Sequence, residues 1–309
     1  MTQLKLYQKT PIKSPTKNGL KFIDLFAGIG GFHLALHHLG LECVFASEWD
    51  SHARKTYEAN FEAISPQVFY GNFAGDITQV QPKNIPNFDI LCAGFPCQPF
   101  SQAGFKKGFN ETRGTLFFNI VEILREKKPR AFFLENVRHL LNHDSGRTFS
   151  VIQRTLTKDL GYSFFYKIVK ASDFGLPQHR PRLFMVGFRD IHDFKFPSPV
   201  GIQKTMSDIL EGDCNKKIGY TLRVGGRSSP IHDRRNWDSY LVDNRIVQIN
   251  SKHGLKMQGF PEDFIFPVSE TQAMKQLGNS VAVPAIQAVA QSIVERLACY
   301  ENANIRKAG

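Results

Sequence analysis

Short apolar runs alternate with amphipathic stretches along the chain from residue 20 to residue 188. The apolar runs predict strands at residues 21–26, 43–46, 88–93, 131–134 and 182–187. Apolar residues at helical spacing predict helices from about residue 34 to Gly40, over 116–127 and over 149–160. Because strands that alternate with helices form sheets covered on both faces, we expect an α/β fold with a doubly wound, mostly parallel sheet.

The alternation of strands and helices stops after Phe188. Residues 191–250 are polar and rich in turn residues, and a helical pattern returns only at 284–300. We therefore expect a main domain formed by residues 20–193 together with 272–309, and a small irregular domain over 194–271. Residues 1–19 carry four lysines and no acid, which predicts a basic flexible tail.

Composition narrows the class of protein. The 309 residues include 39 Lys+Arg and 28 Asp+Glu, giving a net charge of +11. This excess favours a polyanionic partner, although it can also serve solubility alone. No apolar run approaches the roughly 18 residues of a membrane span, and the N-terminus has no apolar signal core. The five cysteines are scattered without a CxxC pair, so we expect an intracellular, cytoplasmic protein without disulfides or a metal site.

A glycine-rich turn, residues 27–31, follows the first strand and precedes a helix. Such a turn is a natural site for a nucleoside or anionic ligand, and Glu48 lies 20 residues after Gly28, where a carboxylate can accept from ribose hydroxyls. Trp49 beside it can stack on a base. The strict dinucleotide pattern fails because its third glycine would fall at His33, so a tight turn without a ligand remains an alternative.

A second loop, residues 94–101, places Cys97 between two prolines directly after a predicted strand. Ligands of open α/β sheets bind at this edge, which makes Cys97 a candidate nucleophile, with an inert thiol as the alternative. Glu135 ends the next strand, where it can also be a helix cap or an ion-pair partner. Arg180 and Arg182 precede a further strand and can supply planar, bidentate donors.

Together these motifs resemble the DNA (cytosine-5)-methyltransferases of bacterial restriction–modification systems. The resemblance covers roughly residues 20–300 and rests on segments 24–32, 75–77, 94–101, 135–137, 178–182 and 276–281, in this order, with Glu48. It implies a Rossmann-like methyltransferase domain that uses S-adenosylmethionine and releases S-adenosylhomocysteine, without a metal. Residues 194–271 would then be the target-recognition domain.

The resemblance also implies a reaction. Cys97 would attack carbon 6 of a flipped-out cytosine in double-stranded DNA, and Glu135 would bond to N3. Arg182 would bind the carbonyl oxygen of the base, and Arg180 would contact Glu135 and the DNA phosphate. The implied cofactor-binding residues are Phe26, Gly28, Gly30, Glu48, Trp49, Asp76, Ile77, Pro96, Asn279 and Ser280.

The expected DNA contacts fall in two regions and one motif. The loop at residues 101–113, which would close over the DNA, would contribute Ser101, Lys106, Lys107 and Arg113. The motif at 178–182 would contribute Gln178. The target-recognition segment resembles the family's Thr-Leu element at residues 221–222, and its candidate contacts are Arg223, Arg227, Arg234 and Arg235. Lys252-His253 stands where many family members carry Arg-Glu, which puts the packing of the small domain in doubt.

Three alternatives stay open at this point. The first is a tRNA cytosine-5 methyltransferase of the same family, and the second is a catalytically silent DNA-binding relative. The third, a nicotinamide-dependent dehydrogenase, rests on the glycine turn alone. The expected partner is double-stranded DNA, bound by a monomer, with no membrane and with any cognate restriction endonuclease linked only genetically.

Overall fold

The structure is a computed structural model that describes residues 19–96 and 116–308, and of residues 305–308 only the backbone. Five predicted functional residues lie outside the described residues, as does the predicted tail up to residue 18. These five are Cys97, Ser101, Lys106, Lys107 and Arg113.

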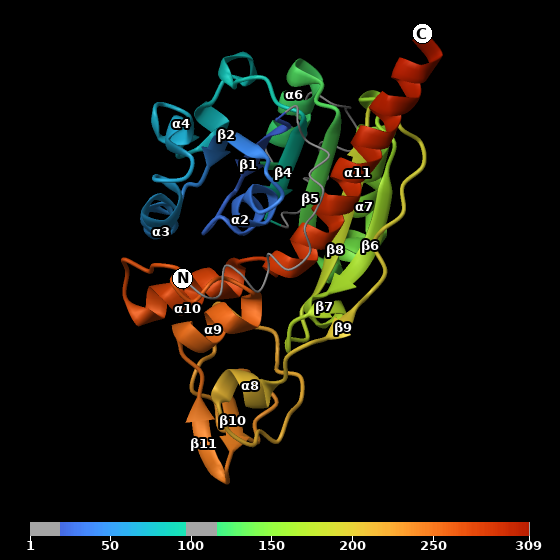
Figure 1. Cartoon of the computed structure of the whole chain (residues 1–309). Coiled ribbons are helices and arrows are strands. Elements are labelled where there is room, and N and C mark those ends of the chain that lie inside the picture. Colours follow the sequence, from blue (N-terminus) through green and yellow to red (C-terminus); the bar gives the residue numbers. More distant parts are fainter. Residues whose placement is uncertain (1–18, 97–115, 309) are drawn as a thin grey trace.

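In the described residues, one seven-stranded sheet forms the centre of the molecule (Figure 1). Its order is β3-β2-β1-β4-β5-β8-β6, in which β8 runs antiparallel to its two neighbours. The strands are β1 (Lys21–Leu25), β2 (Glu42–Ser47), β3 (Phe73–Ala74), β4 (Ile90–Gly94), β5 (Ala131–Val137), β6 (Phe165–Lys170) and β8 (Pro181–Phe188). The predicted mostly parallel α/β sheet is confirmed.

Helices cover both faces of this sheet (Figure 1). Successive strand residues alternate between two apolar clusters, so that Phe22 and Phe133 belong to one cluster while Ile23 and Phe132 belong to the other. The first cluster includes residues of α2 (Gly31–His37), α3 (Ser51–Phe61) and α11 (Val283–Ala308), and the second includes those of α6 (Leu116–Lys127) and α7 (Arg147–Arg154). The central strands are buried on both faces, as expected for a doubly wound sheet.

A smaller part of the molecule extends below the sheet in Figure 1. It carries α8 (Met206–Leu210), the antiparallel hairpin of β10 (Ser239–Val242) and β11 (Arg245–Gln248), and α9 (Ser251–Gln258). Helix α10 (Glu270–Asn279) packs against α9, and both lie between the sheet and the hairpin. The remaining elements are α4 (Pro66–Phe69) and the parallel pair β7 (Phe174–Gly175) and β9 (Gly201–Ile202). The limits 194–271 for a small domain stay a prediction.

Several elements were not predicted from the sequence. Strand β6 has the burial pattern of an exposed edge, with Tyr166 half exposed, so it lacks the apolar run that marks the inner strands. Helix α3 begins after Asp50, whose side chain accepts from the main-chain N–H groups of His52 and Ala53. Its apolar positions are few, and the helix is specified more by this N-cap than by a periodic pattern.

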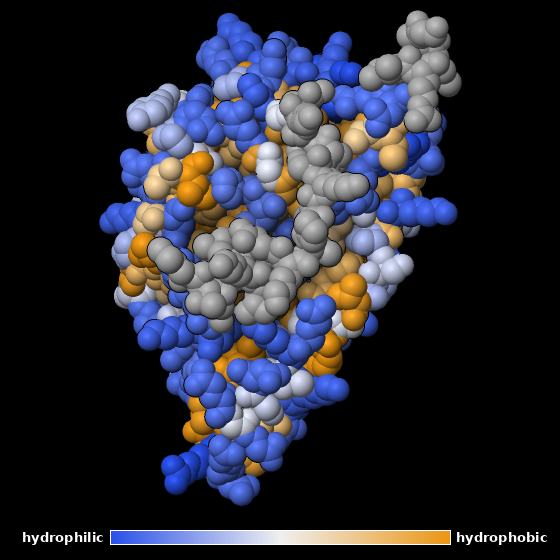
Figure 2. Space-filling model, in the orientation of Figure 1, coloured by the Kyte–Doolittle hydropathy of each residue, from blue (hydrophilic) through white to orange (hydrophobic). Residues whose placement is uncertain are grey.

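One segment is long and apolar enough for a membrane span by length and composition alone, although it contains no unbroken apolar run of that length. Residues Glu270–Asn304 include an 18-residue window with a mean hydropathy of 1.3, and 67% of that window is buried inside the protein. Val289 and Ile293 of α11 are completely or almost completely buried in the core. The apolar character of this segment is therefore explained by packing within the fold. The face of the molecule shown in Figure 2 is hydrophilic over most of its described surface.

Candidate active site

A cavity of about 800 Å³ lies at the edge of the sheet where the parallel strands β1, β2, β4 and β5 end. Residues that follow these strands line it, together with residues from the end of α10. Of the predicted cofactor-binding residues, nine line this one cavity, and Glu135 and Arg182 line it too. The nine are Phe26, Gly28, Glu48, Trp49, Asp76, Ile77, Pro96, Asn279 and Ser280.

The carboxylate of Glu48 is held in place by main-chain donors. The N–H of Gly28 donates to Oε2 at 2.7 Å, and the N–H of Asp50 donates to Oε1 at 2.8 Å. Leu25 and Ser47 are paired in the sheet, so the glycine turn after β1 lies beside the end of β2. Burial raises the pKa of Glu48, and the main-chain donors act against this rise. The result is an oriented acceptor at the cavity wall.

Trp49 and Asp76 present further recognition groups to the same cavity. The indole of Trp49 is 81% exposed, which is unusual for so large an apolar group and leaves its ring face free to stack on a ligand. Asp76 begins a short turn in which its Oδ1 accepts from the N–H and the hydroxyl of Thr78, at 2.9 and 2.8 Å. These contacts orient the carboxylate of Asp76.

Gly30 differs from the other predicted cofactor-binding residues because it does not line the cavity. It precedes α2 with a φ of +82°, and a Cβ built on it would lie 2.2 Å from the ring carbon Cε2 of Phe61. Glycine is therefore required at this position by backbone conformation and by packing against α3. The structure thus gives Gly30 a structural role, and its predicted contact with the cofactor stays a prediction.

The two glycines give a matched pair of variants. We expect Gly30→Ala to lower the free energy of unfolding by about 1–3 kcal/mol, because a methyl group must displace Phe61. Gly28 has a φ of +56° and open space around its Cβ position, so Gly28→Ala bears only the conformational cost and we expect it to weaken cofactor binding instead. Urea denaturation and calorimetric titration separate the two effects, and equal destabilisation by both would contradict this interpretation.

Glu135 and Arg182 form a buried ion pair at the cavity wall. The Nε of Arg182 lies 2.9 Å from Oε1 of Glu135, and the two side chains are 17% and 10% exposed. The sheet brings them together, because β5 and β8 pair Val137 with Arg182. Burial raises the pKa of Glu135, while Arg182 and then Arg180 act in the opposite direction. A carboxyl group with a raised pKa can hold a proton for a ligand.

Asn136 connects this strand end with the segment that leads to Cys97. Its Nδ2 donates to the carbonyl oxygen of Phe95 at 2.8 Å, and its Oδ1 accepts from the N–H of Val137. Asn136 is 2% exposed, and Phe95 is followed by Pro96 on the cavity wall. The side chain of Asn136 therefore fixes the start of the predicted cysteine loop against β5, a role that was not predicted from the sequence.

Arg180 and Gln178 are held by contacts that were not predicted from the sequence. Arg180 is 1% exposed, and its guanidinium donates to main-chain carbonyls of Leu222, Gly278 and Ser280. The ion-pair partner of Glu135 is Arg182, while Arg180 acts on Glu135 through its charge, and the contact of Arg180 with a DNA phosphate stays a prediction. Gln178 is completely buried and bonds to the main chain of Leu222 and Met257. Its donor and acceptor are thus engaged within the protein, and the predicted DNA contact stays a prediction.

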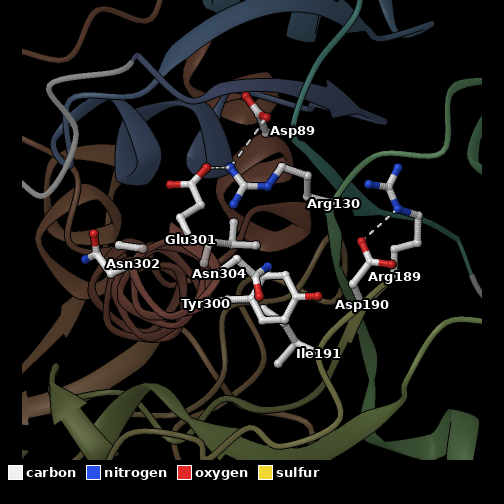
Figure 3. A pocket seen from close by; sticks show the side chains of 11 residues that line it. Asp89, Arg130, Arg189, Asp190, Ile191, Tyr300, Glu301, Asn302 and Asn304 are labelled. Atoms are coloured by element: carbon white, nitrogen blue, oxygen red, sulfur yellow. Dashed lines mark hydrogen bonds and ion pairs between the residues drawn. The ribbon is translucent and has the colours of Figure 1, made fainter. Parts of the chain in front are cut away.

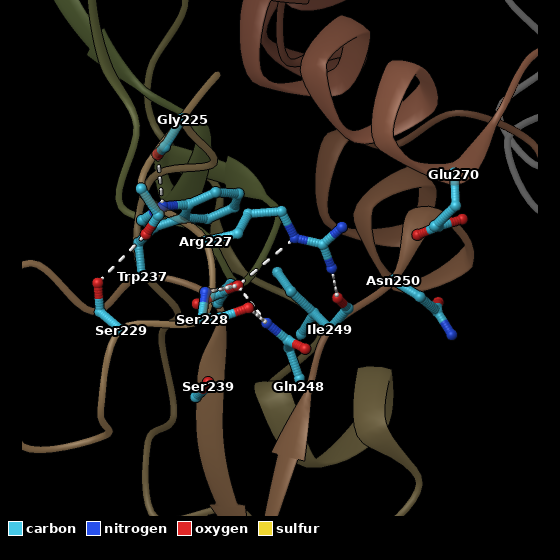
Figure 4. A network of polar contacts seen from close by, with 12 residues as sticks. Gly225, Arg227, Ser228, Ser229, Trp237, Ser239, Gln248, Ile249, Asn250 and Glu270 are labelled. Atoms are coloured by element: carbon cyan, nitrogen blue, oxygen red, sulfur yellow. Dashed lines mark hydrogen bonds and ion pairs between the residues drawn. The ribbon is translucent and has the colours of Figure 1, made fainter.

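The four predicted arginines of the smaller part have different surroundings. Arg223 and Arg234 are exposed, and Arg235 is exposed in an ion pair with Asp233 at 2.7 Å. Arg227 is directed inward, and its Nη2 donates to the carbonyl of Ile249 at 2.8 Å (Figure 4). DNA contact by these arginines stays a prediction.

A buried carboxylate organises the loop that carries Arg223 and Arg227. Asp238 is completely buried, and its Oδ2 accepts from the N–H of Ser228 and from Nε2 of Gln248. The Nε of Arg227 lies 3.5 Å from the same oxygen, and the indole N–H of Trp237 donates to the carbonyl of Gly225. The loop is thereby fixed in one conformation although much of it is exposed.

A second cavity of about 780 Å³ lies at the opposite edge of the sheet, beside the end of α11 (Figure 3). Its arginines are already paired: Arg130 lies 2.8 Å from Glu301 and 3.9 Å from Asp89, and Arg189 lies 3.0 Å from Asp190. It contains none of the predicted functional residues. Within residues 19–96 and 116–304, no group of three or more His, Cys, Asp or Glu side chains is placed to hold a metal ion.

Comparison with known proteins agrees with this geometry. The family model described as C-5 cytosine-specific DNA methylase matches residues 20–225 and 220–295. The chain is 43% identical to the type II methyltransferase M.SsoII of Shigella sonnei, over 94% of this chain and 84% of the relative. It is also 43% identical to the type II methyltransferase M.NgoBI of Neisseria gonorrhoeae, over 87% and 91%.

Solved structures share the fold. DNMT2 of Spodoptera frugiperda superposes with a TM-score of 0.66 at 20% identity, covering 89% of this chain and 99% of that protein. The match of the family model over nearly the whole chain and the identity to the two relatives lead to one conclusion. The chain belongs to the C-5 cytosine-specific DNA methylases, the family of DNA (cytosine-5-)-methyltransferases.

Proposed function

We propose that this chain is the modification methyltransferase of a type II restriction–modification system and transfers a methyl group from S-adenosylmethionine to carbon 5 of a cytosine in double-stranded DNA. One observation supports this most strongly. One cavity is lined by Glu48 and Trp49, which are predicted to bind the cofactor, and by the ion pair of Glu135 with Arg182. Pro96, the neighbour of Cys97, lines the same cavity.

The cavity fits the cofactor by its chemistry. A volume of about 800 Å³ lies in the usual range for small-molecule sites. Glu48, oriented by two main-chain N–H groups, would accept from the ribose hydroxyls, Trp49 would stack on the adenine, and Asp76 would accept from the adenine amino group. When bound, S-adenosylmethionine supplies the methyl group.

The chain's own residues would prepare the cytosine. The thiolate of Cys97 forms a bond to carbon 6, which makes carbon 5 nucleophilic. Glu135, protonated or sharing a proton, bonds to N3 and stabilises the charge that develops on the ring. Arg182 keeps Glu135 oriented and lies within reach of the carbonyl oxygen of the base. After methyl transfer, carbon 5 loses its proton and the bond from Cys97 to carbon 6 breaks.

This chemistry requires the cytosine to leave the base stack, at a cost of a few kcal/mol. The exposed Arg223 and Arg234 would contact guanine edges or phosphates of the surrounding duplex. The protein would act as a monomer on DNA in the bacterial cytoplasm. A cognate restriction endonuclease would be linked to it only through the genome.

Base-resolution methylome sequencing of DNA from cells that express the chain tests this proposal. We expect 5-methylcytosine at one short recurring sequence, and purified protein should methylate duplex DNA that carries this sequence but not tRNA. Cells that express Cys97→Ser provide the matched background. Methylation of tRNA without methylation of DNA would overturn the proposal in favour of the RNA branch of the family.

A further inference from the structure

The segment that carries Arg223 is joined to the cofactor cavity by an unusual set of contacts. Both main-chain groups of Leu222 are held by side chains that precede β8: its N–H donates to Oε1 of Gln178 at 3.1 Å, and its carbonyl accepts from Nη1 of Arg180 at 3.2 Å. Leu222 is 1% exposed, while the next residue, Arg223, is exposed. The position of Arg223 is therefore determined by contacts with the main domain.

The same guanidinium also holds the end of α10. Nη2 of Arg180 donates to the carbonyl of Gly278 at 2.9 Å and to the carbonyl of Ser280. Carbonyls at a helix C-terminus have no partner within the helix and carry partial negative charge, so a cation is favourable there. Asn279 and Ser280, which this contact positions, line the cofactor cavity.

A third contact brings the two segments together without any side chain. A Cβ built on Gly278 would lie 2.5 Å from the carbonyl carbon and oxygen of Arg223 and 2.9 Å from the N of Val224. The main chain at Arg223 and Val224 therefore packs directly on the end of α10. A shift of one segment must be accommodated by the other, because packed interiors do not deform continuously.

The burial of Arg180 indicates that its contacts with Leu222 and with the end of α10 have a role beyond simple packing. Its guanidinium is enclosed with no carboxylate among its hydrogen-bond partners, and its Nε has none among the described residues. Burying a charge this way is costly unless it is compensated, and here the hydrogen bonds that compensate it come from three carbonyls of two functional segments, while the charge of Glu135 also favours the guanidinium. A neutral side chain could fill the space but could not join these carbonyls.

We propose that Arg180 is a positioning residue that couples target reading to cofactor binding, by holding Leu222 and the turn at Gly278–Ser280 in one fixed arrangement. This inference rests on the proposed function and deepens it. When DNA binds correctly to the segment that carries Arg223, it then stabilises the arrangement in which Asn279 and Ser280 complete the cofactor cavity. Arg180 does not touch the reacting atoms.

The test is a binding cycle with S-adenosylhomocysteine, which binds without turnover. Its Kd is measured with and without duplex DNA that carries the site identified by methylome sequencing, and the ratio of the two values is the coupling factor. For the wild-type protein we expect a factor of about 5 to 150, the usual range for coupled sites. For Arg180→Lys and Arg180→Met we expect a factor below about 2, because methionine has no donor and the compact ammonium of lysine does not reproduce the planar spread of the guanidinium donors.

A matched control distinguishes coupling from general loss of structure. Tyr162→Phe removes another buried bond from a side chain to a main-chain carbonyl, that of Pro129 at 2.7 Å, and Tyr162 does not line the cavity. We expect this variant to keep the wild-type coupling factor. If Arg180→Met does not fold, Gly278→Ala disturbs the contact between the end of α10 and the main chain of Arg223. This variant should also lower the coupling factor.

The outcomes separate the inference from the proposed function. A wild-type protein that does not methylate DNA overturns the function. A wild-type protein that methylates DNA but has a coupling factor near 1 overturns the inference alone, and so does Arg180→Lys with an unchanged factor. A coupling factor that drops equally in Tyr162→Phe also overturns the inference, because the effect would then not be specific to the contacts of Arg180.

Discussion

Cys97→Ser is expected to reduce the rate of methyl transfer by at least about 10³-fold, because a serine hydroxyl is a far weaker nucleophile than a thiolate near neutral pH. Without a bond to carbon 6, carbon 5 of cytosine does not react with a methyl sulfonium. Initial rates with labelled S-adenosylmethionine and duplex DNA that carries the recognised site measure this loss. Gel-shift titration should show DNA affinity within a few-fold of wild type.

Cys299→Ser is the matched control for this variant. Cys299 is a free, exposed cysteine on α11, and it lines neither of the two cavities. We expect its replacement to leave the rate of methyl transfer unchanged. Normal turnover by Cys97→Ser, or an equal loss in Cys299→Ser, would contradict the assignment of the nucleophile.

Glu135→Gln is expected to lower the rate of methyl transfer by about 10²- to 10⁴-fold, the usual contribution of a positioned acid or base. Glutamine keeps the shape of the side chain and can still accept from Nε of Arg182, but it cannot supply a proton to N3. Single-turnover rates isolate this step. Cofactor affinity should change little, since the residues predicted to bind the cofactor, such as Glu48 and Trp49, are unchanged.

The pH profile gives Glu135→Gln a second, independent readout. Burial raises the pKa of Glu135, so the protonated form persists to higher pH than for an ordinary carboxyl group. In the proposed mechanism the protonated form is the active one, and the wild-type rate should therefore decline as pH rises through this raised pKa. The variant has no proton to lose and should lack this decline. A decline that is identical in both proteins would show that another group causes it.

Much of the site could be predicted because parallel strands end at one edge of a sheet. Glu48, Pro96 and Glu135 each follow an apolar run, and the structure brings them to one cavity. The order of the strands and the antiparallel direction of β8 were not predicted. They depend on pairings between distant segments, such as Glu135 with Phe184, that no local pattern reports.

The contacts that were not predicted involve residues whose surroundings depend on the three-dimensional fold. Arg180 and Gln178 are polar residues in a motif, and the sequence favoured contacts with DNA, but their partners are main-chain groups about 40 to 100 residues away. Gly30 was grouped with Gly28, although its nearest neighbour is Phe61. Asn136 carries no signal of its own, because its bond to Phe95 joins two segments that only the sheet brings together.

The high mean hydropathy of Glu270–Asn304 was not predicted from the sequence. In Glu270–Asn304 the apolar residues are interrupted by polar ones such as Asn279 and Ser280, and no single run stands out. In the fold, 67% of the segment's most apolar 18-residue window is buried. Hydropathy alone does not distinguish such a core helix from one that spans a membrane.

Mass spectrometry of a trapped complex tests the central claim most directly. Duplex DNA with 5-fluorocytosine at the methylated position is incubated with the protein and S-adenosylmethionine, and the fluorine at carbon 5 prevents the loss of a proton that would release the enzyme. We predict a covalent protein–DNA adduct, with the modified base on the peptide that contains Cys97. Absence of an adduct under conditions of normal turnover on cytosine, or attachment to a different residue, would contradict this account of the active site.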